Sequence, residues 1–229
     1  MIILTGASGG IGKEIAGILS NSHDIIGIYN KSKPIFSNDR VLYEKVDLLN
    51  SVQIKEFINK WRGKLSKVVF IHAAAMSIDG LAMNYKKEDW DHVMNVNLKG
   101  SFLFTMALLP FMIAQKWGRI INLSSIVGQQ GAVGTIAYSA SKSALVGMTK
   151  VLALEYGRFN ITSNILALGY FQGGLINSLQ DKAKQEIKKK IPMNKFGEIE
   201  NVAHAIDFLI KSDYTNGAII NIDGGISSK

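Results

Sequence analysis

Residues 5–12 read Thr-Gly-Ala-Ser-Gly-Gly-Ile-Gly and follow a short apolar run. Glycines let the backbone turn tightly, and without a Cβ atom the main chain can approach a phosphate closely. An amphipathic pattern starts directly after this turn, so the N–H groups of a helix N-terminus would lie beside it and attract anions. A glycine-rich turn alone is a weak signal, but at a first strand-to-helix junction it predicts phosphate binding. We expect the contacts to come from Gly6, Ser8, Gly10, Ile11 and Gly12.

Short β-branched runs alternate with longer amphipathic stretches along the chain. Several runs are almost wholly apolar, which is typical of strands buried on both faces of a parallel sheet. We expect strands at residues 2–5, 25–29, 41–46, 68–72, 119–123, 161–166 and 218–222, and helices at 11–20, 51–61, 90–115, 137–159 and 201–210. This alternation predicts an α/β fold of three layers, a doubly wound, Rossmann-like parallel sheet of about seven strands flanked by helices.

Composition places the 229 residues in one globular domain, 1–229, because 47% are hydrophobic and no linker or repeat divides them. The chain has no cysteine, which excludes a disulfide framework and a thiolate metal site, and we expect no metal site of another kind. The first residues show no basic leader, so we expect no signal peptide and a cytoplasmic location. The most apolar stretch, 102–114, is shorter than the about 20 residues that cross a membrane, and we expect a buried or interface helix instead.

The net charge of +8 raises the question of a nucleic-acid partner. The lysines are spread along the chain, with one cluster in residues 182–190 that is typical of a solvated helix face. Aromatic interleaving and known binding motifs are missing from the sequence, so we expect neither a nucleic-acid nor a membrane partner. Attraction of an anionic substrate or an acidic carrier protein is the better use of this charge.

The second expected strand ends in residues 28–32, Ile-Tyr-Asn-Lys-Ser. An acid at this place binds the ribose hydroxyls of NAD and repels the 2′-phosphate of NADP. Here no acid is present, and Asn30, Lys31 and Ser32 can contact a phosphate. We therefore favour NADP(H) over NAD(H), with a solvated loop lysine as the alternative interpretation of Lys31.

Asp47 follows the third expected strand. Its carboxylate is expected either to accept a hydrogen bond from an adenine amino group or to cap the helix that begins near Ser51. The sequence does not separate these two interpretations.

Tyr138-Ser139-Ala140-Ser141-Lys142 lies near the start of a long expected helix. A spacing of four residues puts Tyr138 and Lys142 on one face, one turn apart. The pKa of a tyrosine is ordinarily about 10, and a neighbouring ammonium lowers it toward the range useful for acid/base catalysis. Taken alone, a tyrosine and a lysine at this spacing are usually surface residues, so a catalytic interpretation needs support from other positions.

Two further polar positions support an active site. Ser125 ends the fifth strand, and in a parallel sheet strand ends and the following helix starts converge on one crevice, where its hydroxyl can bind a substrate carbonyl oxygen. Asn97 stands among Val93, Met94, Val96 and Leu98 and could hold a water that relays a proton to Lys142. The alternative is a hydrogen-bonded core asparagine or a helix kink.

The chain resembles the short-chain dehydrogenase/reductase family of the single-domain type, and within it the 3-oxoacyl-acyl-carrier-protein reductases. The matching segments are TGASGGIG at 5–12, WDHVMNVNLKG at 90–100, GRIINLSSIVG at 118–128, YSASK at 138–142 and NGAIINIDGG at 216–225. The resemblance implies that Tyr138 is the general acid in carbonyl reduction, that Lys142 also binds the nicotinamide ribose, that Ser125 orients the carbonyl and that Asn97 completes the proton relay. It further implies cofactor contacts from Leu48, Ala73, Ala74, Gly169 and Phe171, besides Asp47, Tyr138 and Lys142.

Three positions depart from the family pattern. His72-Ala73-Ala74-Ala75 replaces the frequent Asn-Asn-Ala-Gly, Leu168-Gly169 replaces Pro-Gly, and Gly173 stands where a threonine often contacts the nicotinamide carboxamide. The chain has four histidines and no clustered carboxylates, so we interpret His72 as a hydrogen-bonded structural residue rather than a metal ligand or an acid/base group.

Residues 170–197 are expected to form a substrate lid, and the end of this segment is similar to that of 3-oxoacyl-acyl-carrier-protein reductases. The first hypothesis is therefore reduction of a 3-oxoacyl thioester, linked to a carrier protein or to a small molecule, by NADPH. The alternatives are a sugar, a polyol or a small ketone as substrate, a sugar-nucleotide epimerase or dehydratase, and a non-catalytic nucleotide-sensing or scaffold protein. Residues 102–109 carry more apolar surface than one domain buries, so we expect a homotetramer or homodimer.

Overall fold

The structure is a computed structural model, and it describes residues 1–32, 34, 38–172 and 180–228. Seven parallel strands form one sheet in the order β3-β2-β1-β4-β5-β6-β7. The strands are β1 (Ile2–Thr5), β2 (Ile25–Tyr29), β3 (Val41–Lys45), β4 (Val69–His72), β5 (Gly118–Ser125), β6 (Ile161–Leu168) and β7 (Ile219–Ile222). The order runs outward from β1 in both directions, so the carboxyl ends of β1 and β4 flank the point where the winding reverses, the usual place of a ligand crevice.

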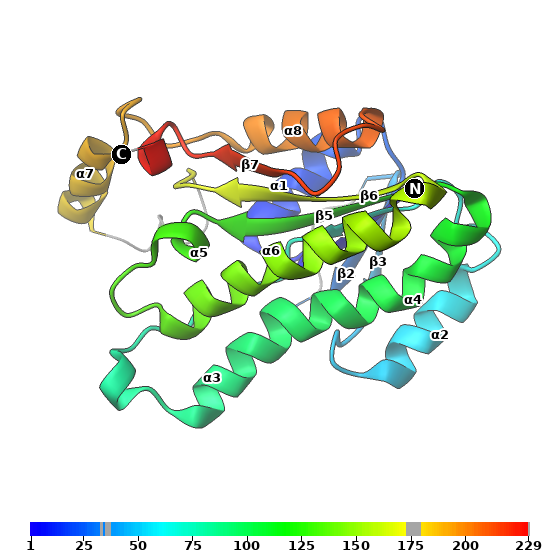
Figure 1. Cartoon of the computed structure of the whole chain (residues 1–229), viewed down its shortest axis with the longest axis horizontal. Coiled ribbons are helices and arrows are strands. Elements are labelled where there is room, and N and C mark those ends of the chain that lie inside the picture. Colours follow the sequence, from blue (N-terminus) through cyan, green and yellow to red (C-terminus); the bar gives the residue numbers. More distant parts are fainter. Residues whose placement is uncertain (33, 35–37, 173–179, 229) are drawn as a thin grey trace.

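Helices cover both faces of this sheet (Figure 1). The helices are α1 (Gly10–Leu19), α2 (Ser51–Trp61), α3 (Lys87–Met94), α4 (Gly100–Gln115), α5 (Val127–Gln130), α6 (Ile136–Tyr156), α7 (Asp181–Lys190) and α8 (Ile199–Lys211). A π-helical segment η2 (Asn95–Lys99) joins α3 to α4, and short 3-10 turns are η1 (Ala82–Asn84), η3 (Gly157–Phe159) and η5 (Ile226–Ser228). The fold class predicted from the sequence, a three-layer Rossmann-like α/β fold, is confirmed.

The two largest hydrophobic clusters among the described residues lie on opposite faces of the sheet, because successive strand residues point to opposite sides. In β1, Ile2 and Leu4 join the core formed with α1 and α8, whereas Ile3 joins the core formed with α2, α4 and α6. Buried side chains that fill both faces explain why the strands read as continuous apolar runs. The two cores hold the carboxyl ends of the strands in fixed positions, and these ends carry the site described below.

Element boundaries differ from the expected ones by at most three residues. The long helix expected at 90–115 begins at Lys87 and is interrupted by the π segment, and the helix expected at 137–159 ends in a 3-10 turn. The lysine-rich stretch forms α7 and is largely exposed, as its pattern predicted.

The apolar stretch 102–114 lies in α4, at the end of a helical run from Lys87 to Gln115 that includes the π segment. Among the described residues, Lys87–Gln115 is long and apolar enough, by length and composition alone, to cross a membrane. In this structure one side of it packs on the sheet, with Phe104, Leu108 and Met112 fully buried in the core. Its apolar character is therefore that of a core helix with an exposed second face, where Phe102 and Met106 lie.

Candidate active site

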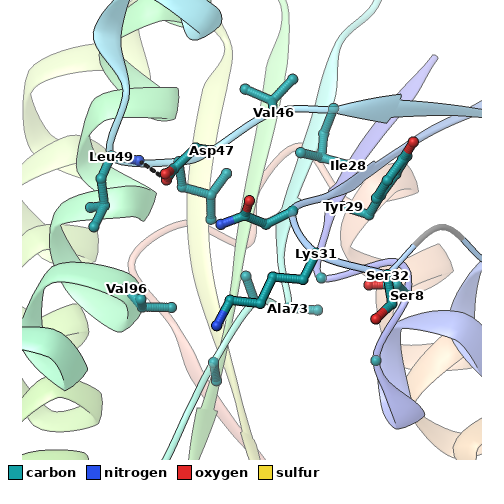
Figure 2. A pocket seen from close by; sticks show the side chains of 16 residues that line it. Ser8, Ile28, Tyr29, Lys31, Ser32, Val46, Asp47, Leu49, Ala73 and Val96 are labelled. Atoms are coloured by element: carbon teal, nitrogen blue, oxygen red, sulfur yellow. Dashed lines mark hydrogen bonds between the residues drawn. The ribbon is translucent and has the colours of Figure 1, made fainter.

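A hollow of about 330 Å³ opens at the carboxyl ends of β1, β2 and β4. It is lined by many of the residues expected to bind a dinucleotide, namely Gly6, Ser8, Asn30, Lys31, Ser32, Asp47, Leu48, Ala73 and Ala74. Figure 2 shows the Lys31 side chain extending across the hollow toward Val96, with Ser8 and Ser32 drawn on the opposite side. The crevice that the strand order predicts is thus present where the glycine-rich turn lies.

The glycine-rich turn requires its glycines for two separate reasons. Gly6 has a φ of +72°, and a Cβ atom there would lie 2.7 Å from the backbone of Ala74. A Cβ atom on Gly12 would lie 2.3 Å from the carbonyl oxygen of Gly6. The helix that follows begins at Gly10, and its N-cap Gly9 has no side chain to occupy the free N–H groups. This turn therefore fits the pyrophosphate of a dinucleotide, which binds such N–H groups.

Asp47 lines the hollow, and its carboxylate accepts a hydrogen bond from the main-chain N–H of Leu49 at 2.9 Å. The interpretation of Asp47 as a helix cap is wrong, because α2 is capped by Asn50, whose side chain accepts from Val52 and Gln53. An asparagine directly before the first helical residue is the better-placed cap. The second oxygen of Asp47 retains the capacity to accept from a ligand.

The other expected cofactor residues lie around the hollow rather than on its wall. Gly10, Ile11 and Gly12 form the first turn of α1. Gly169 packs against Asp223, and Phe171 lines a second hollow, of about 450 Å³, at the base of the expected lid. Sequence reasoning missed several lining residues, namely Gly9, Ile28, Tyr29, Val46, Leu49, Ala75 and Val96. Each of them lies within two residues of an expected site residue, and this closeness in sequence was the available signal.

Tyr138 and Lys142 share one face of α6, as their spacing predicted. The Lys142 ammonium lies 5.6 Å from the centre of the Tyr138 ring and donates a hydrogen bond to the carbonyl of Leu123 at 2.7 Å. That carbonyl is available because β4 ends at His72, opposite Asn122, so β5 has no partner on that side at Leu123. The end of one strand therefore positions the lysine of a helix.

Burial is the largest influence on the pKa values of Tyr138 and Lys142. Burial raises the pKa of Tyr138, and a hydrogen bond with Ser125 opposes that rise. Burial lowers the pKa of Lys142 to about 8. The expected net lowering of the tyrosine pKa is not found, because loss of water around the phenol outweighs the interactions that favour the phenolate. Near neutral pH the phenol therefore keeps its proton, and the lysine is largely charged.

Ser125 ends β5 and lies beside the Tyr138 hydroxyl, with which it shares a hydrogen bond. Its own oxygen also accepts from the N–H of Val127 at 3.2 Å. The serine and the phenol thus point to one place, at which a carbonyl oxygen could accept a hydrogen bond from each.

Asn97 lies fully buried in the π segment η2. Its side-chain oxygen accepts from the N–H of Met76 at 2.8 Å, and its amide nitrogen donates to the carbonyl of Met76 at 2.9 Å and to Ser141 at 3.0 Å. The interpretation of a hydrogen-bonded core asparagine is confirmed for the side chain. A role in proton relay stays a prediction and would have to use the main-chain carbonyl.

His72 is buried and hydrogen-bonded on both ring nitrogens, as expected for a structural histidine. The four residues expected to be catalytic, Asn97, Ser125, Tyr138 and Lys142, lie at one end of the crevice, which is called the chemical end below. Ser141, which binds the Asn97 amide, donates to the carbonyl of Tyr138 at 2.7 Å and precedes Lys142. The segment expected to form the lid is described in part, and Gly173 lies outside the described residues.

Comparison with known proteins places this geometry in a family. Residues 6–227 match the family described as Enoyl-(Acyl carrier protein) reductase. The chain is 37% identical to the 3-oxoacyl-[acyl-carrier-protein] reductase FabG of Thermotoga maritima, over 98% of this chain and 96% of that protein. It is 37% identical to the protein of the same name from Rickettsia conorii (98% and 95%) and 34% identical to nodulation protein G of a Rhizobium species (98% and 96%). The chain therefore belongs to the short-chain dehydrogenase/reductase family and is an NAD(P)-dependent oxidoreductase.

Proposed function

We propose that this protein reduces the keto group of a 3-oxoacyl thioester carried by an acyl carrier protein, with NADPH as the reductant. The observation that carries the proposal is a partly buried phenol, Tyr138, whose hydroxyl lies beside that of Ser125 and whose ring lies one helical turn from Lys142. Relatives at 37% identity over nearly their whole length bear the name of this activity.

Tyr138 is proposed as the proton donor to the carbonyl oxygen. Its pKa is raised by burial, so the phenol is protonated near neutral pH and ready to act as an acid in the direction of reduction. Ser125 is proposed to donate a second hydrogen bond to the same oxygen, which stabilises the negative charge that develops there. The Lys142 ammonium next to the ring favours the phenolate left after proton transfer.

A bound nicotinamide cofactor supplies the hydride in this reaction. The pyrophosphate is proposed to bind the N–H groups at the start of α1 beside Gly6 and Ser8, and Lys142 to bind the nicotinamide ribose. Lys31 and Ser32 border the end of the hollow where a 2′-phosphate would lie. Among the described residues that line the hollow, the acidic residue is Asp47, which follows β3 and not β2. This favours NADPH over NADH, because a lysine attracts and a strand-end acid would repel that phosphate.

The substrate is proposed to enter between the catalytic residues and a lid formed by about residues 170–197 of a single domain. Helix α7 in this segment carries Lys182, Lys184, Lys188 and Lys189, a positive surface suited to an acidic carrier protein. The name of the matching family, an enoyl reductase, makes a carbon–carbon double bond the second candidate target. Sugars, polyols and small ketones remain alternatives within the same chemistry.

The protein is further proposed to act in the cytoplasm as a homotetramer or homodimer. On α4, Phe104, Leu108 and Leu109 are buried, whereas Phe102 and Met106 stay about half exposed. On α6, Val151 and Leu154 are also exposed, and a hollow lined by Phe102, Ala144 and Met148 lies between the two helices. A second copy is the occupant that fits this apolar face, and light scattering at micromolar concentration that shows a stable monomer would contradict it.

The test of the activity is oxidation of NADPH, followed by its absorbance, with a panel of 3-oxoacyl thioesters, enoyl thioesters, ketones and sugars. The proposal predicts the highest kcat/KM for a 3-oxoacyl thioester, and a further rise when the thioester is attached to acyl carrier protein. A preference for enoyl thioesters would move the proposal to the second candidate. Tight NADPH binding without turnover of any substrate would favour a nucleotide-sensing or scaffold protein.

A further inference from the structure

His72 lies between the two halves of the site without belonging to either. It ends β4 and is fully buried, and its ring is tilted against that of Phe70, with 6.3 Å between the ring centres. Its two ring nitrogens contact two different segments: Nδ1 lies 2.9 Å from the hydroxyl of Thr5, and Nε2 lies 3.2 Å from the main-chain carbonyl of Asn97. Thr5 is the residue directly before Gly6 of the dinucleotide turn, and Asn97 lies at the chemical end.

The hydrogen-bond directions around this ring are determined by its neighbours. A carbonyl can only accept, so Nε2 carries the hydrogen and donates to Asn97. The Thr5 oxygen accepts from the N–H of Ala74 at 3.3 Å, which leaves its own hydrogen to point at Nδ1. The ring is therefore a neutral imidazole that donates on one side and accepts on the other. Burial and the facing ammonium of Lys142 lower the pKa of His72 to about 3, so this state persists at ordinary pH.

The Asn97 main chain is held from a second direction by its own side chain. That side chain is bound to Met76 and Ser141, and Ser141 directly precedes Lys142. π-helical segments depart from the regular i→i−4 hydrogen-bond pattern and occur frequently at functional sites. In η2, the direction of the Asn97 carbonyl thus depends on His72 as well as on the helix.

We propose that His72 is a positioning residue that couples the dinucleotide turn to the proton-transfer set, by holding Thr5 with one ring nitrogen and the Asn97 carbonyl with the other. The inference rests on the proposed function, because it assigns that carbonyl to the proton relay beside Lys142. His72 itself does not touch the ligands, since Ala73, Ala74 and Ala75 after it line the hollow whereas its ring is buried beneath. It is therefore neither an acid nor a base in the reaction.

Two conservative variants separate the two contacts. His72→Asn places an acceptor at the position of Nδ1 but has no group that reaches as far as Nε2. His72→Gln places an amide donor at the position of Nε2 but leaves nothing at Nδ1. In the full-length protein, His72→Asn is expected to keep the Kd of NADPH and to lower kcat by up to about 100-fold, the cost of misplacing a catalytic group by about one ångström. His72→Gln is expected to keep most of kcat and to weaken NADPH binding about fivefold, as expected for the loss of one hydrogen bond.

Ser101→Ala serves as the matched control. It removes a buried hydrogen bond of 2.7 Å, to Asn122, from the helix that follows η2, but touches neither Thr5 nor Asn97. It is expected to lower the Tm while kcat and the Kd of NADPH stay within twofold of the wild type. If the two His72 variants behave like Ser101→Ala, or lower kcat and NADPH affinity in the same proportion, His72 is only a packing residue and the proposal is wrong.

A measurement without turnover keeps this result distinct from that of the proposed function. ¹⁵N NMR of the imidazole, assigned with the variants, is expected to show a neutral ring with hydrogen on Nε2 that does not titrate between pH 5 and pH 8, about the span over which an ordinary histidine does. A hydrogen on Nδ1, or protonation in this range, would overturn the coupling even if the enzyme is active. If no ketone is reduced, the proposed function fails, and the ring state and the NADPH affinities still decide whether His72 joins the two segments.

Discussion

The two ends of the crevice hold their functional groups in opposite ways. At the chemical end, Lys142 is 2% exposed and bound to a strand carbonyl, and burial moves its pKa and that of Tyr138. At the other end, which is proposed to bind the adenosine and is called the adenosine end below, Asn30, Lys31 and Ser32 are exposed to solvent on a loop. Water screens the charges of the second group and not those of the first. Substitutions at the chemical end should therefore change rate constants strongly, and those at the adenosine end should change preference moderately and in a salt-dependent way.

The largest effect is expected for Tyr138→Phe. Loss of the phenolic proton should lower kcat by about 10²- to 10⁴-fold, the usual contribution of a general acid, while the Kd of NADPH changes little. Single-turnover reduction and NADPH fluorescence titration measure the two quantities. Tyr156→Phe on the same helix is the matched control and should react at the wild-type rate. Near-normal turnover of Tyr138→Phe would show that Tyr138 is not the general acid, and the contrast between the two ends would then not hold.

Lys31→Asp probes the other end and should have a smaller effect. Reversing one charge a few ångströms from a 2′-phosphate changes an attraction into a repulsion of about 1 kcal/mol or more each, so the ratio of kcat/KM for NADPH to that for NADH should fall by about 10- to 100-fold. The difference should shrink at high salt because the group is exposed. Lys55→Asp, on the exposed side of α2, should leave the ratio unchanged. An unchanged ratio for Lys31→Asp would mean that Lys31 is a solvated loop lysine.

The same contrast explains which features could be predicted from the sequence. Periodicity and the glycine pattern identified the strands, because burial on both faces leaves a continuous apolar run, as in Ile2–Thr5. Spacing placed Tyr138 and Lys142 on one face. What the sequence could not show depends on contacts between distant segments: the partner of the Lys142 ammonium, the π segment around Asn97, and the direction of the tyrosine pKa. Asp47 lies four residues before Ser51, too far to be the cap of α2, whereas Asn50 directly precedes the helix.

The pH dependence of the reduction sharpens the comparison at the chemical end. The pKa of Lys142 in the free protein is about 8, while that of Tyr138 is raised above its ordinary value of 10.0. Lys142 is thus the first of the two to lose its proton as the pH rises, and kcat/KM should fall about tenfold for each pH unit above about 8. The measurement is kcat/KM from pH 6 to pH 10, with stability checked at each value. A plateau that extends to pH 10 would show that the ammonium is not needed or that its pKa is not lowered.

The smallest expected change is in stability, and it has the opposite sign to the loss of activity. A pKa that falls from 10.5 to about 8 on folding means that burying the charged lysine costs roughly 3 kcal/mol at neutral pH, at about 1.4 kcal/mol per pKa unit. The unfolded chain binds the proton more tightly between these two pKa values, so the cost is fully present below pH 8 and is relieved as the pH rises toward 10.5.

Lys142→Met removes the charge and keeps the apolar stem, but it leaves the Leu123 carbonyl without its partner at a cost of about 1–3 kcal/mol. The net result should be an inactive protein whose Tm at pH 7 is equal to that of the wild type or up to a few degrees higher, with the advantage disappearing near pH 10. Lys150→Met, an exposed position on the same helix, should show no such pH-dependent gain. A Tm several degrees below the wild type would mean that Lys142 stabilises the fold, and that its burial is not a cost retained for catalysis.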